Sequence, residues 1–499
     1  MRGHASRGSS LRYRSGGAGD PHDETETVTR RATIPHRPFA DVRPRRTIAP
    51  DDVPARPILG RVTHPESLAQ ETIHWRRTAA PAPAPVPLEG ELDVDALIVG
   101  AGLTGLRAAV SLAEAGVRTA VLDAHDVGHG ASGRSGGQCN PIWRATPAAL
   151  AARLGDAPAE RLVRATLTAA DDLFDDVRRL GIDCGAEQNG WIQAAHTPGA
   201  ARELRALGDA WRAAGADIGT LAGPELHAAS GSGDYEFALS HAKGGCVQPL
   251  ALTRGFAAAA RALGARIHEN TPALAMERAG DRWSVRTPAG RVTADKVILT
   301  TNAYTDGLWP DLRRTVLPMV SVVLATAPVG DELRASVLPG RRTLSDTRLA
   351  IFYARYDATD RLVFGCVGSA DAVDAWGGRR RLANGLRTVF PQLAEVPVEC
   401  VWSGRIAVTP TMMPHLAEPA PGVLAGLGFS GRGIAMTSVM GRTLARRALG
   451  ADAAELAFPV STLSPMRFHG LSRALVPAMA PAMSLRDRAA VRIGRIARR

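Results

Sequence analysis

Residues 95–123 show the most informative pattern of hydrophobic and polar positions in the chain. Residues 96–99 form an apolar run typical of a strand that is buried in a parallel sheet. From residue 103 to 115 small and apolar residues recur at helical spacing, and Gly116 follows as a helix terminator. Residues 120–122 form a second apolar run. The pattern predicts a strand, a helix and a second, parallel strand.

A glycine-rich turn joins the first of these strands to the helix. Gly100 permits a tight turn, Gly102 lets the backbone approach a pyrophosphate, and Gly105 lets the helix lie close to the strand. The helix N-terminus offers N–H groups and a positive dipole end to phosphates. Asp123 follows the second strand, where a carboxylate accepts hydrogen bonds from ribose hydroxyls. The unit predicts a dinucleotide site and leaves NAD and FAD both open. Its expected contacts are Gly100, Gly102, Leu103, Thr104, Gly105 and Asp123.

The periodicity changes further along the chain. Residues 146 to about 216 have helical spacing, interrupted by a strand-like stretch at 191–194. Short alternating segments between about 303 and 400 indicate an antiparallel sheet. A glycine-rich turn followed by a helix returns at residues 426–448.

The segment between these regions contains shorter elements. A helix is expected at 250–263 and a strand at 265–267. Residues 283–286 and 291–293 predict a hairpin, and residues 296–301 predict a separate apolar strand.

Together these elements predict an α/β fold with two domains. A Rossmann-type nucleotide domain is built from discontinuous segments, and an α+β substrate domain containing an antiparallel sheet is inserted between them. The nucleotide domain is expected at 94–145, 235–302 and 400–450, and the substrate domain at 146–234 and 303–399. The remaining segments are a disordered extension at 1–60, a proline-rich approach segment at 61–93 and a basic tail at 451–499.

The charge and cysteine content exclude several classes of function. The net charge is +11, but only Lys243 and Lys296 are lysines, and the arginine excess lies largely in the tail. This is a compositional bias, so we expect no nucleic-acid partner. Five scattered cysteines without CxxC spacing argue against a disulfide scaffold or a zinc site, and we expect no metal and a reducing cytoplasm. Neither an export signal nor a membrane-spanning run is predicted. Pro477 and Pro481 are expected to break the tail, which we expect to be solvated rather than docked on a membrane.

Two further glycine-rich segments extend the predicted site. The loop at residues 128–140, GHGASGRSGGQCN, offers glycines and serine hydroxyls that can pass close to a diphosphate and a flavin ring. Within it Arg134 is a candidate for a phosphate, a substrate carboxylate or the surface. FSGRG at residues 429–433 leads into a helix whose N-terminus would stabilise the negative charge that gathers at the N1–C2 edge of a reduced flavin.

These segments resemble one family. GASGRSGGQ at 130–138, KVILTTNAYT at 296–305, and the stretches 402–416 and 426–445 resemble the D-amino-acid oxidase superfamily, in particular its γ-glutamylputrescine oxidase-like amine oxidases. The resemblance implies FAD as the cofactor. It adds as expected contacts Ala131, Ser132, Arg134, Ser135, Gly136, Gly137, Gln138, Asn302, Gly428, Phe429, Ser430, Gly431, Arg432 and Gly433.

The sequence departs from the family pattern at three of these contacts. Asp123 stands where Glu is more common, Ser135 where Asn is common, and Arg432 where a His is frequent. The charge of Arg432 either stabilises reduced flavin or points away to solvent. These departures concern the identity of the substrate more than that of the cofactor.

The resemblance implies an enzyme that oxidises a C–N bond of an amine or amino acid. A hydride would pass from the substrate carbon to flavin N5, the resulting imine would hydrolyse, and oxygen or another acceptor would reoxidise the flavin. The alternatives are an NAD(P)-dependent dehydrogenase and a non-catalytic flavin-binding scaffold. Strand alternation places Tyr353 and Arg355 on one face, as candidates for positioning a substrate carboxylate. His241 and His415 are candidate bases with a structural role favoured, and Cys139 is expected to be a buried structural cysteine rather than a covalent flavin attachment point.

Overall fold

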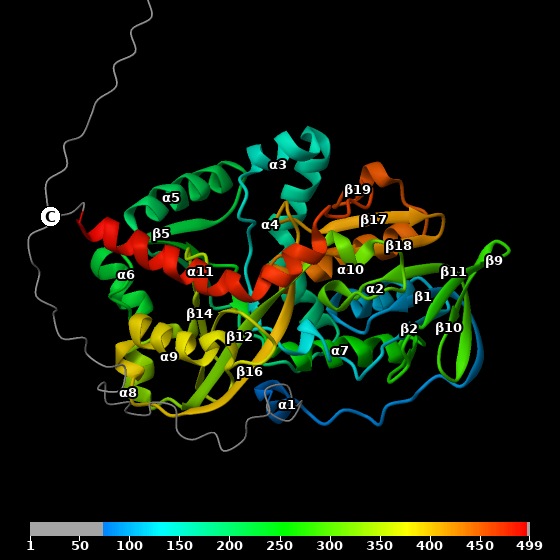
Figure 1. Ribbon diagram of the computed structural model, residues 1–499, viewed down its shortest axis with the longest axis horizontal. Helices are drawn as coiled ribbons and strands as arrows, with labels where there is room; N and C mark the ends of the chain where they lie inside the picture. Colours follow the sequence, from blue (N-terminus) through cyan, green and yellow to red (C-terminus); the bar gives the residue numbers. More distant parts are fainter. Residues whose placement is uncertain (1–72, 497–499) are drawn as a thin grey trace, which may run out of the picture. The chain divides into compact units, whose positions relative to one another are not determined.

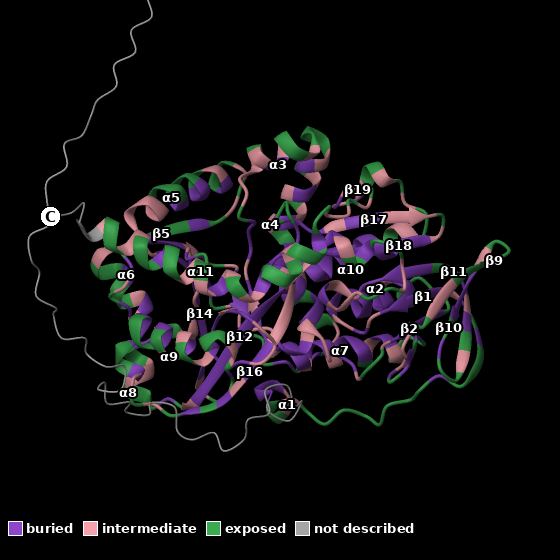
Figure 2. Ribbon diagram, in the orientation of Figure 1, coloured by how far each residue is buried: buried purple, intermediate pink, exposed green. Residues whose placement is uncertain are grey.

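A computed structural model describes residues 73–496 of the chain, which form two large sheets and the helices that cover them (Figure 1). Both sheets are largely buried, whereas the outer helices turn one face to solvent (Figure 2). The extension predicted at residues 1–60 lies outside the described residues.

The first sheet has nine strands and holds the βαβ unit at its centre. Strand β1 (Gly90–Val99) pairs in parallel with β2 (Thr119–Leu122) on one side and with β11 (Gly290–Leu299) on the other. The strand order is β19-β17-β18-β11-β1-β2-β8, and β9 and β10 extend β11 as an antiparallel hairpin. The other strands are β8 (Arg266–His268), β9 (Ala275–Ala279), β10 (Arg282–Arg286), β17 (His415–Ala420), β18 (Val423–Leu427) and β19 (Val460–Ser461).

Two predicted strand boundaries are wrong. Strand β1 starts at Gly90, six residues before the apolar run, because Leu92 and Val94 alternate with polar residues and bury only one face of that half. The strands expected at 291–293 and 296–301 are one strand, β11. The first half of β1 pairs with the first half of β11 in unbroken register from Gly90 opposite Gly290, which keeps β11 continuous.

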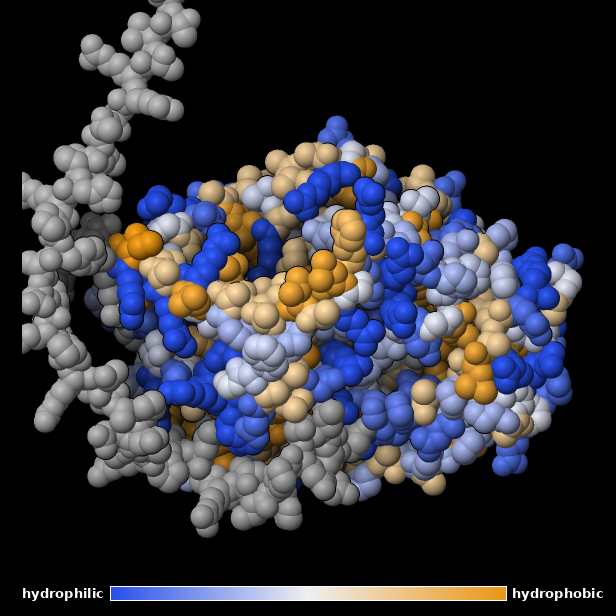
Figure 3. Space-filling view, in the orientation of Figure 1, coloured by the Kyte–Doolittle hydropathy of each residue, from blue (hydrophilic) through white to orange (hydrophobic). Residues whose placement is uncertain are grey.

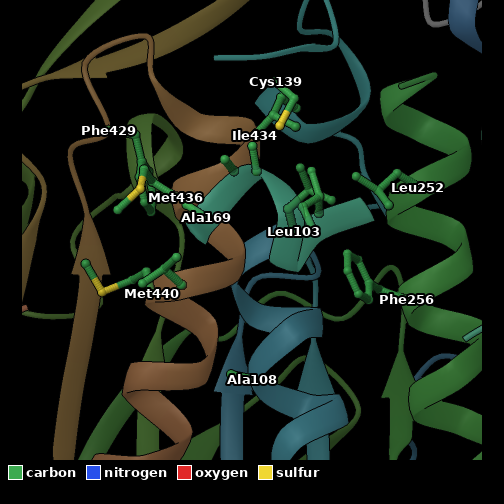
Figure 4. Packing of buried hydrophobic residues seen from close by; sticks show 14 of the residues in the cluster. Leu103, Ala108, Cys139, Ala169, Leu252, Phe256, Phe429, Ile434, Met436 and Met440 are labelled. Atoms are coloured by element: carbon green, nitrogen blue, oxygen red, sulfur yellow. The ribbon is translucent and has the colours of Figure 1, made fainter. Parts of the chain in front are cut away.

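Three helices pack on this sheet around the nucleotide turn, and a fourth packs on one of them. The three are α2 (Leu103–Glu114), α7 (Pro249–Ala262) and α10 (Gly433–Ala448), and the fourth is α4 (Asp156–Arg179), which packs on α10. Helices α2 and α10 cross closely at Gly441, where a Cβ would come within 2.7 Å of the Thr104 carbonyl oxygen. Figure 4 shows the apolar side chains at this junction, among them Leu103, Ala108, Phe256, Met436 and Met440.

The second sheet has eight mostly antiparallel strands, in the order β16-β12-β15-β14-β13-β4-β6-β5. These strands are β4 (Trp191–Ala195), β5 (Ile218–Ala222), β6 (Phe237–His241), β12 (Leu317–Pro328), β13 (Thr343–Asp346), β14 (Tyr353–Tyr356), β15 (Arg361–Gly368) and β16 (Val398–Val408). The helices not yet named are α1 (His74–Thr78), α3 (Pro147–Leu154), α5 (Pro198–Ala213), α6 (Gly223–Ser230), α8 (Asp331–Ser336), α9 (Gly378–Val389) and α11 (His469–Ile496). A two-stranded ribbon, β3 (Gln138–Cys139) with β7 (Gly245–Cys246), follows the glycine loop.

The architecture is the predicted one, a Rossmann-type domain made of discontinuous segments with an inserted α+β domain. Strands β6 and β16 belong to the second sheet, although most of their residues lie in segments expected to join the nucleotide domain. The chain therefore crosses between the sheets within 235–302 and near residue 408. The exact domain boundaries stay a prediction.

The C-terminal segment differs from the expected broken and solvated tail. Helix α11 runs through Pro477 and Pro481 without a break and packs against β12 and β15. It is tied to the second sheet by Asp487, which is buried and accepts the backbone N–H groups of Leu349 and Ala350 at 3.0 Å each. Its outer face exposes the apolar side chains of Leu471, Leu475, Leu485 and Ile493, and Phe468 just before the helix is also exposed. Orange areas lie along this helix in Figure 3. None of the helices in residues 73–496 is long and apolar enough to span a bilayer.

Candidate active site

A cavity of about 460 Å³ is lined by residues of the nucleotide turn, the loop after β2, the N-terminus of α10 and the second sheet. It thus brings together segments that are more than 300 residues apart in sequence, such as Gly100 and Arg432. Nearly all the predicted cofactor contacts line it.

The nucleotide turn has the geometry that its glycines predict. Gly100 has φ +112°, a conformation that residues with a side chain rarely adopt. A Cβ on Gly105 would lie 2.2 Å from the Gly100 carbonyl oxygen, so only glycine permits this helix–strand distance. The Leu103 N–H at the start of α2 donates to Ser132 Oγ at 3.0 Å, which joins the glycine turn to the glycine loop. The turn is therefore rigid before any phosphate binds.

Asp123 lies at the carboxyl end of β2, as expected for a ribose-binding acid. Its Oδ2 accepts the Ala101 N–H at 2.7 Å, and its Oδ1 accepts the His125 N–H at 2.9 Å. Burial raises the pKa of Asp123 to about 6, against the lowering effect of these two hydrogen bonds. Each oxygen keeps a second lone pair, so the carboxylate can still accept from a ribose hydroxyl.

The glycine loop is held by its side chains and leaves one hydroxyl free. Arg134 is buried and donates from Nε to the His129 carbonyl oxygen at 2.8 Å. Gln138 donates from Nε2 to the carbonyl oxygens of Leu344 and Ala354, both at 2.9 Å, and so ties the loop to the second sheet. The Oγ of Ser135, in contrast, is buried without a hydrogen-bond partner among the described residues, and the residue lines the cavity. Such an orphaned group fits a ligand that supplies the missing partner.

The turn before α10 is the second half of the predicted site. Asn302 accepts the Gly428 N–H with Oδ1 at 2.9 Å, which fixes this turn to the end of β11. Gly431 lines the cavity at φ +83°, and a Cβ there would meet nothing within 4 Å, so its face opens into the cavity. Ser430 turns away, because its Oγ accepts the Thr409 N–H at 3.3 Å and donates to the Gly428 carbonyl oxygen.

Arg432 does not point to solvent. It is the residue before the first turn of α10, is 8% exposed and lines the cavity. Its guanidinium lies 4.6 Å from the ring centre of Trp191 on β4. Burial, and then the positive charge of Arg144, lower the pKa of Arg432 well below its usual value.

Tyr353 and Arg355 share one face of β14, as the alternation predicts, but only Tyr353 reaches the cavity. Tyr353 Oη lies 2.9 Å from Ser321 Oγ, and burial raises its pKa, so the phenol stays protonated. Arg355 donates to three backbone carbonyl oxygens, those of Gly136 at 2.7 Å, Val247 at 2.8 Å and Tyr356 at 3.1 Å. Each of its three nitrogens thus donates to the backbone, one of them to the glycine loop, and Arg355 does not line the cavity, so the structure does not bring it to a substrate.

The other candidate side chains lie outside the cavity wall. His241 stacks on Trp191 with ring centres 4.5 Å apart, and burial lowers its pKa to about 3, too low for a base near neutral pH. Burial also lowers the pKa of His415, which is not in the cavity lining. Cys139 is fully buried in the core, and burial raises its pKa. These residues have structural positions.

Most of the predicted site is therefore assembled, with four exceptions. The predicted residues that do not line the cavity are Gly105, Gly428, Ser430 and Arg355. Gly105 and Gly428 act through the backbone geometry of the turns. The sequence reasoning missed several lining residues, of which the most informative are Arg144, Thr300, Tyr304, Ser321, Ser345 and Arg405. Arg144 follows the glycine loop closely, and Thr300, Tyr304 and Arg405 lie in the segments 296–305 and 402–416 that resemble the family. Ser321 and Ser345 are placed only by the topology.

Comparison with known proteins identifies the family. Residues 95–447 match the family described as FAD dependent oxidoreductase (DAO). The chain is 30% identical to the γ-glutamylputrescine oxidoreductase of Escherichia coli over 363 residues, 72% of this chain and 84% of that protein. It is 28% identical to a probable oxidoreductase OrdL of Rhizobium meliloti over 372 residues, 73% of this chain and 85% of that protein.

Solved structures show the same fold. The glycine oxidase of Geobacillus kaustophilus superposes with a TM-score of 0.62 at 21% identity, covering 75% of this chain and 99% of that one. The L-proline dehydrogenase of P. horikoshii superposes with a TM-score of 0.60 at 17% identity, covering 72% and 93%. The orphaned Ser135 hydroxyl and the open face of Gly431 fit the cofactor of that family. The chain is an enzyme of the FAD-dependent oxidoreductase (DAO) family, and FAD is its cofactor.

Proposed function

We propose that this enzyme oxidises a C–N bond of an amine or amino acid. The observation that supports this most directly is the single cavity shared by the FAD-binding segments and the second sheet, which places Tyr353 and Ser321 beside the cofactor loop. Relatives whose names state a reaction are a γ-glutamylputrescine oxidoreductase and glycine oxidases, all of which act on amines.

The residues of the chain prepare the cavity for this reaction. Gly100, Gly102 and the N-terminus of α2 would hold the pyrophosphate, and Asp123 the ribose. The turn at Gly431 and the start of α10 would face the flavin with backbone N–H groups. FAD held there would supply the acceptor for the hydride that leaves the substrate carbon.

Tyr353 shapes the site without taking a proton. Its ring packs on the backbone of the loop, since a Cβ on Gly136 would come within 2.6 Å of it. Ser321 Oγ donates to the Cys366 carbonyl oxygen at 3.2 Å, so the Tyr353 hydroxyl donates in turn to Ser321. The substrate amine would enter as the free base, and the product imine would hydrolyse in water.

Two finer points belong to the proposal. Oxygen, which would give hydrogen peroxide, or another acceptor would take the electrons from the reduced cofactor. The five cysteines are all free and buried, which supports a reducing cytoplasm as the location.

Anaerobic reduction of the purified holoenzyme tests the proposed reaction. The protein should be yellow, should keep FAD through gel filtration, and its visible flavin absorbance should bleach with an amine or amino acid from a panel. Retention of FAD separates this enzyme from an NAD(P)-dependent dehydrogenase. A flavin that no amine reduces, but that dithionite does, would contradict the proposal and favour a non-catalytic flavoprotein.

A further inference from the structure

One end of the cavity contains a buried arginine whose charge is not compensated by the protein. The Nε and Nη1 of Arg432 are buried without a hydrogen-bond partner in the described part of the chain, and the residue is 8% exposed. A guanidinium has five N–H donors, and leaving them unpaired away from water is costly. The indole of Trp191 covers one face of the group and accepts no conventional hydrogen bond.

A second arginine without a counter-charge faces the same cavity. Arg144 lines the cavity, and burial lowers the pKa of its guanidinium below the usual value. Within residues 73–496 neither Arg144 nor Arg432 forms an ion pair with a carboxylate. The two charges lie close enough for Arg144 to lower the pKa of Arg432.

The neighbouring groups do not neutralise this pair. Asp346 is the acid that acts on Arg144, but it is already paired with Arg348, accepts the Tyr235 hydroxyl at 3.1 Å and is 3% exposed. His241 stacks on the same indole, that of Trp191, and stays neutral because its pKa is about 3.

Arg405, at the same cavity, is in contrast paired with a carboxylate. Arg405 lines the cavity and forms an ion pair with Asp371, with Nε 3.1 and 3.0 Å from the two carboxylate oxygens. Arg134 also lines the cavity without a carboxylate partner, but its guanidinium donates to the carbonyl oxygens of His129 and Ser403. Within residues 73–496, Arg144 and Arg432 are thus the two cavity arginines with neither a carboxylate nor a carbonyl partner for the side chain.

We propose that Arg144 and Arg432 form an anion subsite that binds a carboxylate of the amine substrate. Guanidinium groups bind carboxylates through charge-assisted hydrogen bonds, which would satisfy the donors that the protein leaves free. The same charges repel a second ammonium group. The enzyme therefore selects amines that also have an acidic group and rejects simple diamines. This inference rests on the proposed amine oxidation. It assigns the substrate specificity to Arg144 and Arg432, and not to Arg355 of the second sheet.

Binding of a non-oxidisable acid to the holoenzyme tests the subsite without turnover. Propionate should perturb the visible spectrum of bound FAD and bind at least about tenfold more tightly than the isosteric propionamide. In Arg144→Gln and Arg432→Met the propionate Kd should rise by at least about tenfold, while in the control Arg405→Gln it should change less than about threefold. Equal binding of propionate and propionamide would overturn the proposal, as would variants that bind propionate like the wild type.

A second readout keeps the test valid if Arg432→Met folds poorly. Arg144 is accessible, so Arg144→Gln should keep the wild-type melting temperature and provides the binding result on its own. The kinetic effect should lie in KM for an acidic amine more than in kcat. If Arg432 instead serves only the reduced flavin, Arg432→Met will lower the flavin potential and leave the propionate Kd unchanged, which contradicts the proposal.

The outcomes separate this inference from the proposed function. Propionate binding without reduction by any amine keeps the anion subsite and rejects amine oxidation. Reduction by diamines and acidic amines alike, with no propionate binding, keeps amine oxidation and rejects the subsite.

Discussion

Two buried arginines in this enzyme lie at the same distance from a tryptophan ring but differ in their hydrogen-bond acceptors. Arg355 lies 4.6 Å from the ring centre of Trp75, and Arg432 lies 4.6 Å from that of Trp191. Arg355 donates to three backbone carbonyl oxygens, whereas Arg432 has two nitrogens with no acceptor. The first arginine stabilises the fold, and the second is left for a ligand. Burial and an aromatic partner alone do not distinguish these roles; the acceptors do.

The largest effect is expected from removing the satisfied arginine. Arg355→Met would leave the carbonyl oxygens of Gly136, Val247 and Tyr356 without their donor, so the free energy of unfolding should fall by roughly 3 kcal/mol or more. FAD should also be lost on gel filtration, because the glycine loop is released. Urea unfolding followed by circular dichroism measures the first effect. A variant as stable as the wild type would remove the distinction between the two arginines.

In the same urea experiment, Arg432→Met should not lower the free energy of unfolding. The substitution removes an unpaired buried charge, so the unfolding free energy without ligand should be unchanged or higher by about 1 kcal/mol. A loss as large as that of Arg355→Met would show that Arg432 stabilises the fold through Trp191.

Gly105→Ala tests the rigidity of the nucleotide turn. The new Cβ would lie 2.2 Å from the Gly100 carbonyl oxygen and must push α2 away from β1, at a cost of about 2 kcal/mol. FAD retention should fall together with stability. Gly116→Ala, where a Cβ meets nothing within 4 Å but φ is +76°, is the matched control: it should lose stability through backbone strain and still retain FAD.

FAD binding should weaken below pH 6 through Asp123. Its pKa of about 6 means that the carboxylate is lost as the pH falls through 6, and a carboxyl group is a poorer acceptor for a ribose hydroxyl. The Kd for FAD should therefore rise by up to about tenfold between pH 7 and pH 5.

The stability of the apoprotein should change with pH in the opposite direction. Because the folded pKa lies above the ordinary value of 3.8, the contribution of Asp123 to stability is present below about pH 4 and is lost as the pH rises through 6. Asp123→Asn should lack both effects, and an unchanged pH dependence in that variant would assign them to other groups.

Ser135→Ala is expected to have the smallest effect on the Kd for FAD and not to lower the stability of the apoprotein. The hydroxyl has no partner in the described residues, so its removal should leave the apoprotein at least as stable. The FAD Kd should rise only a few-fold, by the loss of about one hydrogen bond. If the apoprotein loses stability instead, Ser135 has a structural partner and its assignment to the cofactor fails.

The comparison also shows how far the sequence could predict this molecule. The βαβ unit, the turn at Gly100 and the helix start after Gly431 follow from local spacing, because glycine conformations and helix periods are encoded in neighbouring residues. Arg355 was assigned to the substrate because alternation gives the face of a strand and not the backbone that lies opposite. Arg144 lies just after the glycine loop, so its place beside the site follows from local sequence, but its approach to Arg432 joins segments that are distant in sequence. Helix α11 was missed for a similar reason: its prolines suggest a break, while its contacts with β12 and β15 hold it together.

Anaerobic titration of the holoenzyme with two matched pairs of amines tests the central claim most directly. The pairs are proline against prolinamide and γ-aminobutyrate against putrescine, which differ in whether the amine also has a carboxylate. We predict that the flavin is bleached by at least one carboxylate-containing member and at least about tenfold less readily by its partner. Bleaching by putrescine and prolinamide as fast as by their acidic partners would contradict the account.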